Sequence, residues 1–181
     1  MNVTIKNNRF LKVSEIKPEE LRSFMLNEVG ERAQDKLYNY LKDLSESYPQ
    51  FENWFYDTVI PEVELKKGER EIIIVLSEIE GSRKSILTGI AILKNNKKEK
   101  KICTFRIHEN FRKQGIGSAL FEECFDYLGT RKPIITISHN RKEIFEHHIN
   151  NYGFQETQIL KGYYKEDSTE YVYNGLLDGN K

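Results

Sequence analysis

The sequence predicts an α/β fold contained in a single domain, and three features of the chain support this class. Residues 17–60 carry apolar side chains at helical spacing. Residues 71–107 instead contain continuous runs of β-branched and other apolar residues, which favour strands covered on both faces. After residue 107, a glycine-containing turn and an amphipathic helix follow directly on such a strand. The length of 181 residues is that of one ordinary domain.

The N-terminal part of the chain, residues 1–64, is expected to form one strand and several helices. Apolar positions between residues 8 and 16 favour the strand, and Pro18 favours the start of a helix. The next two helices are predicted over residues 37–44 and 51–60. Pro61 is expected to end the last of these helices, because proline disrupts a helix interior.

The remainder, residues 70–177, is expected to contain most of the sheet. The predicted strands are 71–79, 85–94, 101–107, 133–138, 155–164 and 170–176, and the predicted helices are 115–128 and 140–151. Gly129 is expected to end the first of these helices, and Asn140 to cap the second. A lysine-rich run over residues 94–101 is typical of a solvated hairpin loop, with contact to a phosphate group or RNA as the alternative.

The amino-acid composition limits which binding partners and which cellular compartment we expect for this protein. Acidic and basic residues balance at 28 each, which gives no support for nucleic acid or a membrane as an obligatory partner. Cys103 and Cys124 are far apart and fit no metal spacing, so we expect reduced thiols and no metal site. No apolar run approaches the ~20 residues of a membrane span, and the first residues lack the apolar core of a signal peptide. We therefore expect a cytoplasmic protein.

The most informative stretch of the sequence runs from Arg112 to Ser118 and reads Arg-Lys-Gln-Gly-Ile-Gly-Ser. It lies between the apolar run 102–107 and the predicted helix that follows. Glycines allow a tight turn and a close approach of the backbone to a ligand. The first free amides of a helix, together with its dipole, favour an anion at that end. The segment is therefore predicted to form a phosphate cradle. The alternative is a tight turn with a purely structural role.

The pattern Arg-x-x-Gly-x-Gly, placed between a strand and a helix, resembles the acetyl-CoA signature of the GNAT acyltransferases. Gly153-Phe154, at the end of the next predicted helix, is similar to a pair that this family often carries. The resemblance extends over about residues 72–176. It implies a single-domain GNAT-like fold with a mixed central sheet, N-terminal helices, a strand meander and a β-α-β-α-β-β C-terminal half. Residues 1–181 would be one N-acetyltransferase domain, with 1–64 on the acceptor side and 70–177 as the acyl-CoA-binding core.

The resemblance implies acetyl-CoA as cosubstrate and assigns it to two segments. The residues that would cradle its pyrophosphate are Arg112, Lys113, Gln114, Gly115, Ile116, Gly117 and Ser118. In the family, a strand that diverges from its neighbour offers unpaired backbone groups to the pantetheine arm, which implies Phe105, Arg106 and Ile107 here. Because backbone groups would make these contacts, side-chain substitutions there should be tolerated better than a proline.

The activity implied by the resemblance is acetylation of a primary amine. The amine attacks the thioester carbonyl of acetyl-CoA, and an acid protonates the leaving thiolate. Many members use a tyrosine four residues before the glycine of Gly-Phe, and that position is Ile149 in this chain. Tyr152 is the nearest hydroxyl and becomes the candidate catalytic acid. The alternatives are His148, Tyr164 and Tyr173.

The general base and the acceptor stay open at this point. Glu78 or Glu80 is a candidate to receive the amine proton through water, and an amine that is already neutral needs no base. Strand alternation predicts that Cys103 faces away from Thr104 and Arg106, and that Thr104 and Arg106 line the acceptor cleft together. Metabolites, antibiotics, proteins and RNA-linked amines are all open as the source of the acceptor, and so is homodimer formation.

Two other functions compete with acetylation of a primary amine. Because a tyrosine is missing at Ile149, a non-catalytic CoA-binding module with a regulatory or interaction role is one alternative. The other is a toxin that acetylates aminoacyl-tRNA. The lysine-rich run 94–101 is the sequence feature in favour of such a toxin, and the neutral net charge argues against it.

Overall fold

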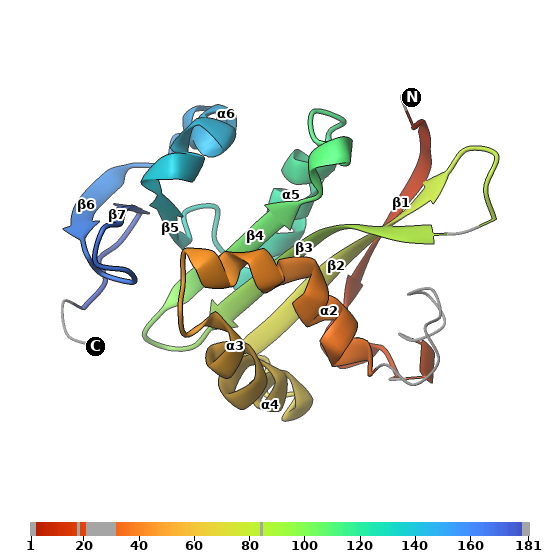
Figure 1. Ribbon diagram of the computed structural model, residues 1–181, viewed down its shortest axis with the longest axis horizontal. Helices are drawn as coiled ribbons and strands as arrows, with labels where there is room; N and C mark the ends of the chain where they lie inside the picture. The colour runs from red at the N-terminus through yellow and green to blue at the C-terminus, as the bar shows by residue number, and fades with distance from the viewer. Residues whose placement is uncertain (1–2, 18, 21–31, 84, 179–181) are drawn as a thin grey trace.

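One seven-stranded sheet organises the chain, with the strand order β1-β2-β3-β4-β5-β7-β6 (Figure 1). The computed structural model describes residues 3–17, 19–20, 32–83 and 85–178. The strands are β1 (Ile5–Lys12), β2 (Arg70–Ile79), β3 (Ser85–Asn95), β4 (Lys100–Ile107), β5 (Ile134–Ser138), β6 (Glu156–Lys161) and β7 (Thr169–Tyr173). Neighbouring strands are antiparallel except β4 and β5, which run parallel. The predicted α/β fold with a mixed sheet is confirmed.

Helices cover both faces of this sheet (Figure 1). Helices α2, α3 and α4 lie on one face of the central strands, α5 lies on the other face, and α6 lies beside β5. The helices are α2 (Ala33–Leu41), α3 (Phe51–Trp54), α4 (Ile60–Glu64), α5 (Ile116–Leu128) and α6 (Lys142–Tyr152). The short helical segments are η1 (Val13–Glu15), η2 (Lys42–Glu46), η3 (Phe55–Val59), η4 (Glu109–Phe111) and η5 (His139–Arg141). In the described part of the chain, none of the helices combines the length and the apolar character needed to cross a membrane.

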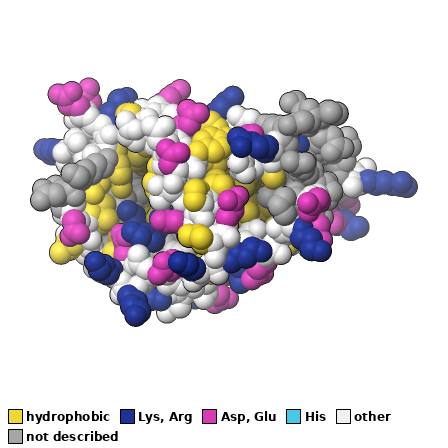
Figure 2. Space-filling model, turned by 90° about the horizontal axis from the view of Figure 1, so that it is seen from below, with side chains coloured by type: hydrophobic (Ala, Val, Ile, Leu, Met, Phe, Trp, Pro, Cys, Tyr) yellow, Lys and Arg dark blue, Asp and Glu magenta, His cyan; other side chains and the backbone are white. Residues whose placement is uncertain are grey.

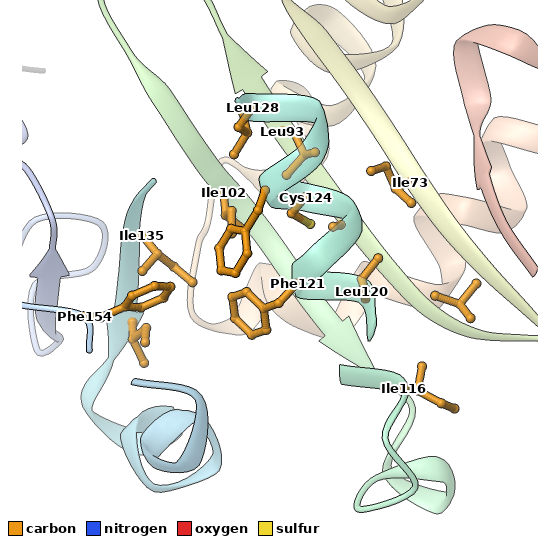
Figure 3. Close-up of a cluster of buried hydrophobic side chains, with 14 of the residues drawn as sticks. Ile73, Leu93, Ile102, Ile116, Leu120, Phe121, Cys124, Leu128, Ile135 and Phe154 are labelled. Carbon is orange, nitrogen blue, oxygen red and sulfur yellow. The ribbon is translucent and has the colours of Figure 1, made fainter. Parts of the chain in front are cut away.

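Alternation along β2 builds two separate hydrophobic cores. Ile73 and Val75 pack in the core under α5, whereas Ile72 and Ile74 pack in the core under α2, α3 and α4. Each of these four side chains is at most 1% exposed. Figure 3 shows the core under α5, where side chains of the helix such as Phe121 face the strands. Coverage on both faces explains why the strand sequences are continuously apolar.

The predicted third helix does not end at Pro61. α3, η3 and α4 follow one another without a break from Phe51 to Glu64, and η3 is a π-helical turn. Inside a regular helix, proline lacks an N–H and clashes with the carbonyl four residues earlier. Pro61 instead sits in the first turn of α4, directly after the wider π turn, where that hydrogen bond is not required. The prediction that Pro61 stops the helix is therefore wrong.

Other boundaries differ from the prediction in smaller ways. The first strand ends at Lys12 and continues as a 3₁₀ turn instead of reaching residue 16. Pro18 and residues 21–31, where a helix was expected, lie outside the described residues. Asn140 does not cap α6, because it lies inside the preceding η5 turn. Gly129 ends α5 in the left-handed conformation, with φ 66°, as expected.

A β-bulge in β4 changes which side chains share a face. Cys103 has no partner in β3, so the alternation along β4 is interrupted at this residue. Cys103 packs against the core under α2, α3 and α4, and Thr104, which lies opposite Ile92, faces the same side. The prediction that the side chains of Cys103 and Thr104 face opposite sides of the sheet is wrong. The extra residue in the bulge shifts the alternation of side chains by one position. Thr104 and Arg106 do share a face, since both are paired with β3 after the bulge.

The strands β4 and β5 separate soon after they begin. They pair at Lys101–Ile134 and Ile102–Ile135, and no further pairs follow. The bulge at Cys103 lies at the point of separation and bends β4 locally. Beyond it, backbone groups of the two strands no longer bond to each other across the gap. The sheet therefore contains a wedge between two parallel strands.

Candidate functional site

The turn before α5 exposes a row of backbone amides. Lys113 (φ 61°) and Gly115 (φ 81°) both have left-handed backbone conformations, which direct successive amides toward one side. Such a conformation is costly for lysine, and strained backbone of this kind occurs at ligand sites. At Gly115, a Cβ would meet no atom within 4 Å, so the space around the turn is open. α5 begins at Ile116, and the amides of its first turn have no partner inside the helix. This geometry favours an anion.

A groove of about 740 Å³, here called the turn groove, runs between this turn, the end of β4 and α6. The predicted acetyl-CoA residues that line it are Phe105, Arg106, Ile107, Arg112, Lys113, Gly115, Gly117 and Ser118. The two that do not are Gln114, which is exposed, and Ile116, whose side chain is buried in the core. The other wall contains His148, a predicted alternative acid, together with residues that sequence reasoning missed, namely Arg141, Glu143, Ile144, Phe145 and His147. No local pattern marks these residues, because only the folded chain brings α6 opposite the turn.

The narrow part of the turn groove needs a glycine. A Cβ at Gly117 would lie 3.1 Å from Nε2 of His148, so a larger residue would fill the space between α5 and α6. Arg112 donates from Nε to the carbonyl of Ile107 at 3.3 Å, which ties the turn to the end of β4. Arg112 and Arg141 both line the groove and bring positive charge to it. Open amides, a glycine at the narrow point and guanidinium groups fit a ligand that carries phosphates.

His148 faces the turn groove beside Gly117. Burial lowers the pKa of its imidazole, and the neighbouring His147 adds a smaller effect in the same direction. The ring is therefore mostly neutral at pH 7. Its Nδ1 is buried and has no hydrogen-bond partner among the described residues. The imidazole stacks on Tyr152, with ring centroids 6.1 Å apart and planes 9° from parallel.

Tyr152, the predicted acid, lies behind His148 and lines neither cavity. Its hydroxyl donates to the carbonyl of Ser118 at 3.3 Å, and Ser118 does line the turn groove. Burial raises the pKa of the phenol, and Glu122 adds to this effect, so the hydroxyl keeps its proton at neutral pH. Phe125 holds the ring edge to face, with centroids 5.0 Å apart. The role of Tyr152 as an acid stays a prediction.

A second cavity, of about 470 Å³, lies between the separated strands and is here called the wedge cavity. Residues 101–105 of β4 and 135–138 of β5 line it, together with residues of α3 and the segment before α3. Phe105, Arg141 and Phe145 line both cavities, which therefore meet where the strands separate. A ligand in the turn groove can thus present one end to a ligand in the wedge cavity.

Aromatic and cationic side chains dominate the wall of the wedge cavity. The aromatic residues include Tyr48, Phe51, Trp54 and Tyr164, and the charged ones are Arg70, Lys94, Glu99, Lys101 and Arg141. Glu62 bonds Arg70 at 2.7 Å, and Glu99 pairs with Lys94 at the same distance. The net charge of the wall is therefore positive. Figure 2 shows the molecule from the side of α3 and α4, where apolar side chains lie recessed among charged ones.

The remaining predicted residues differ in whether they line one of the two cavities. Tyr164 lines the wedge cavity, whereas Tyr173 is 2% exposed and belongs to the core under α5. Glu78 and Glu80 line neither cavity. The lysine-rich run 94–101 forms the hairpin between β3 and β4, as its polar composition indicates.

The side chain of Arg106 has a charged structural partner. Its guanidinium forms an ion pair with the carboxylate of Asp43 in η2. This hydrogen-bonded pair holds the pKa of Asp43 below its ordinary value. The charge of Arg106 is thus compensated within the fold, and its backbone is the part available to a ligand at the end of β4.

A buried carboxylate behind the wedge cavity was missed by sequence reasoning. Glu170 of β7 is 0% exposed, and its backbone pairs with Ser138 of β5. Neither carboxylate oxygen has a hydrogen-bond partner among the described residues. Burial raises the pKa of Glu170 to about 7, against weaker opposing effects of the Ser168 and Tyr48 hydroxyls. One signal was present in the sequence, because Glu170 is the charged residue of the otherwise uncharged strand Thr169–Tyr173.

Gly117→Trp should abolish binding of acetyl-CoA, because the indole would fill the narrow part of the turn groove against His148. Isothermal titration with acetyl-CoA measures the loss, and circular dichroism checks that the variant is folded. The control is Lys97→Trp in the exposed β3–β4 hairpin, which should bind like the wild type. Unchanged affinity in folded Gly117→Trp would place the binding site elsewhere.

Glu170→Gln should stabilise the protein increasingly as the pH rises. The pKa of Glu170 is about 7 in the folded state, above the ordinary value of 4.5 for a glutamate carboxyl. The protonated carboxyl of Glu170 therefore stabilises the fold fully at pH values below the pKa that this group has in the unfolded chain. This stabilisation is lost as the pH rises through the pKa that the group has in the folded protein. Since glutamine stays neutral, the difference in unfolding free energy should grow by roughly 2–3 kcal/mol between about pH 5 and about pH 8.5.

Thermal unfolding across this pH range measures that difference. The matched control is Glu166→Gln, an exposed carboxylate in the turn between β6 and β7, which should show no such trend. A difference between Glu170→Gln and wild type that stays constant with pH would show that Glu170 does not titrate near neutrality.

Comparisons with known proteins identify the fold. A model of the acetyltransferase (GNAT) family matches residues 32–146. No curated protein matches the sequence. A protein from Desulfovibrio desulfuricans described as a GNAT-family acetyltransferase is 12% identical with a TM-score of 0.59, and the match covers 92% of this chain and 97% of that one. A GNAT-family acetyltransferase from Bacillus cereus is 16% identical with a TM-score of 0.51, covering 93% and 96%.

A third similar structure is a chimeric spermidine N-acetyltransferase from Vibrio cholerae and hSSAT. It is 12% identical with a TM-score of 0.50, and the match covers 92% of this chain and 93% of that one. At these identities, the solved structures show a shared fold. The family match spans well over half of the chain and includes β4, β5 and the turn before α5. Acetyl-CoA is the cosubstrate, and the chain belongs to the acetyltransferase (GNAT) family.

Proposed function

We propose that the chain transfers the acetyl group of acetyl-CoA to a primary amine. The observation that carries this proposal is the meeting of the turn groove and the wedge cavity where β4 and β5 separate. Donor and acceptor reach this point from different cavities, so that the amine attacks the thioester carbonyl directly. Holding both reactants in place converts an encounter of two molecules into a reaction within one complex.

The turn groove binds the donor. Amides of residues 112–118 bind the pyrophosphate, and the side chain of Arg112 adds a charge contact. Past the last β4–β5 pair, the backbone of residues 105–107 binds the pantetheine arm through groups that β5 leaves unpaired. The acetyl group then lies next to Phe105, which both cavities share.

Transfer proceeds without a cysteine intermediate. Cys103 lines the wedge cavity, but burial raises the pKa of its thiol, so little thiolate is present at neutral pH. Its Sγ accepts a hydrogen bond from Nη1 of Arg70 at 3.3 Å. Both cysteines of the chain are free thiols, in keeping with the reducing cytoplasm as the place of action.

The wedge cavity holds the acceptor. Its aromatic wall suits an acceptor with an apolar body, and its positive charge disfavours polycations. Lys101 and Arg141 have no ion-pair partner among the described residues, unlike Lys94, which pairs with Glu99. A neutral or negatively charged amine therefore fits this cavity better than a polyamine such as spermidine.

Purified protein should release CoA from acetyl-CoA when a suitable amine is supplied. Thiol release measured over a panel of primary amines tests this, with mass spectrometry to identify the N-acetyl product. Within the panel, phenylalanine should react better than spermidine, because of the positive charge around the wedge cavity. Binding of acetyl-CoA with no acetylation of any amine would support a non-catalytic CoA-binding module instead.

Tyr152→Phe should lower kcat and leave the affinity for acetyl-CoA unchanged, if the phenol protonates the departing thiolate. The ring keeps its packing against Phe125 in this variant, so that only the hydroxyl is lost. His148→Phe is the matched variant on the same helix, since His148 faces the turn groove directly. A fall in kcat with His148→Phe alone would transfer the acid role from Tyr152 to His148.

A further inference from the structure

A protonated amine must lose a proton before it attacks a thioester, and the wedge cavity offers no free base among the described residues. Glu99 is the one carboxylate in its wall, and Glu99 forms an ion pair with Lys94 at 2.7 Å. Glu78 and Glu80 line neither cavity. The proton therefore needs a route through the wall of the cavity.

Glu170 lies directly behind that wall. Its backbone pairs with Ser138, and its charge acts on Tyr48 and Tyr164. All three of these residues line the wedge cavity, and each carries a hydroxyl. Because the side chain of Glu170 is fully enclosed, a proton from the cavity would have to reach it by way of wall groups such as these hydroxyls.

The burial of Glu170 has no structural explanation. Among the described residues its two oxygens have no hydrogen-bond partner of standard geometry, the hydroxyls of Ser168 and Tyr48 offset only part of the effect of burial on its pKa, and it forms no ion pair. A buried, unpaired carboxylate destabilises a fold, because it loses its hydration without compensation. Groups of this kind with a shifted pKa occur preferentially at functional sites.

The groups around Glu170 come from four parts of the fold. They are Tyr48 from the segment before α3, Ser138 from β5, Leu160 from β6, and Tyr164 and Ser168 from the turn between β6 and β7. The cation Arg141 acts on Tyr48. The hydroxyls of Tyr48 and Ser168 thus act on the carboxylate, and Tyr48 also lines the wedge cavity, as Arg141 does.

We propose that Glu170 takes up the proton of the acceptor ammonium through the hydroxyl of Tyr48, an inference that rests on the proposed amine acetylation. The ammonium N–H bond breaks as its proton passes to Oη of Tyr48, and Tyr48 passes its own proton to the carboxylate. The freed lone pair forms the C–N bond at the thioester carbonyl, and the C–S bond breaks. The second amine proton ends on the leaving sulfur, and Glu170 later returns its proton to water.

The protonation properties of both residues suit this relay. Burial raises the pKa of Glu170 to about 7, so it accepts and releases a proton near neutral pH. Burial also raises the pKa of Tyr48, which keeps its hydroxyl protonated and able to donate to Glu170. Glu170 acts through Tyr48, and it is therefore a positioning and proton-accepting residue that does not touch the substrate.

The test compares wild type and Glu170→Gln on two acceptors. One is phenethylamine, which is protonated at neutral pH, and the other is hydroxylamine, which is mostly neutral there. With phenethylamine, kcat/KM of the wild type should fall as the pH drops through about 7. Glu170→Gln should lose this pH dependence and at least about tenfold of the rate, because general-base catalysis contributes about 10²–10⁴-fold. With hydroxylamine, the two proteins should differ by less than about twofold.

Two further variants check the route of the proton. Tyr48→Phe removes the relay hydroxyl and should reproduce the loss seen in Glu170→Gln. Glu166→Gln and Tyr163→Phe, neighbours that do not line the wedge cavity, are matched controls and should behave like the wild type. Affinity for acetyl-CoA, measured by isothermal titration, should be the same in all of these proteins.

The outcomes separate this inference from the proposed function. If Glu170→Gln acetylates phenethylamine with the rate and pH dependence of the wild type, the relay is overturned while acetylation stands. If the wild type binds acetyl-CoA but acetylates neither acceptor nor any amine of the panel, the proposed function is overturned and the relay falls with it. Equal losses on phenethylamine and hydroxylamine would also contradict the relay, because they would indicate a purely structural role.

Discussion

The early separation of β4 and β5 determines where the two cavities of the molecule lie and where they meet. After Lys101–Ile134 and Ile102–Ile135 the two strands no longer pair, and the bulge at Cys103 lies where they part. A continuous sheet would keep the two sides of the molecule apart. Here the gap joins the turn groove to the wedge cavity and leaves backbone groups of β4 free for a ligand. The hydrogen bonds that β4 and β5 do not form are thus the condition for the proposed acetyl transfer in the gap.

The two hydrophobic cores hold this opening in place. α5 carries the proposed phosphate-binding turn at its start, and its buried face packs on β2, β3 and β4 (Figure 3). Phe121 is fully buried and stacks on Phe105, with centroids 4.1 Å apart, so the helix that bears the amides is fixed to the strand that borders the gap. Close packing of this kind fixes the position of the turn relative to the end of β4, so that one extended ligand can contact both.

The fold class and the glycine-containing turn before α5 were predictable from the sequence because both have local signals. Continuous apolar runs indicate doubly covered strands, and glycines between a strand and a helix indicate an anion site. Features that depend on distant contacts were missed. The helix continues past Pro61 because a π turn precedes it, and the bulge at Cys103 is set by pairing with β3. The wall formed by α6 and the environment of Glu170 exist only once β5, β6 and β7 are assembled.

Amide hydrogen exchange in the presence and absence of acetyl-CoA reports directly on the backbone groups that we assign to acetyl-CoA binding. We expect slower exchange for the amides of residues 112–118 and 105–107 when acetyl-CoA is bound. Exchange in β1, which lines neither cavity, should not change. Binding of acetyl-CoA without protection of either segment would contradict the assignment of the turn and of the separated strand as its site.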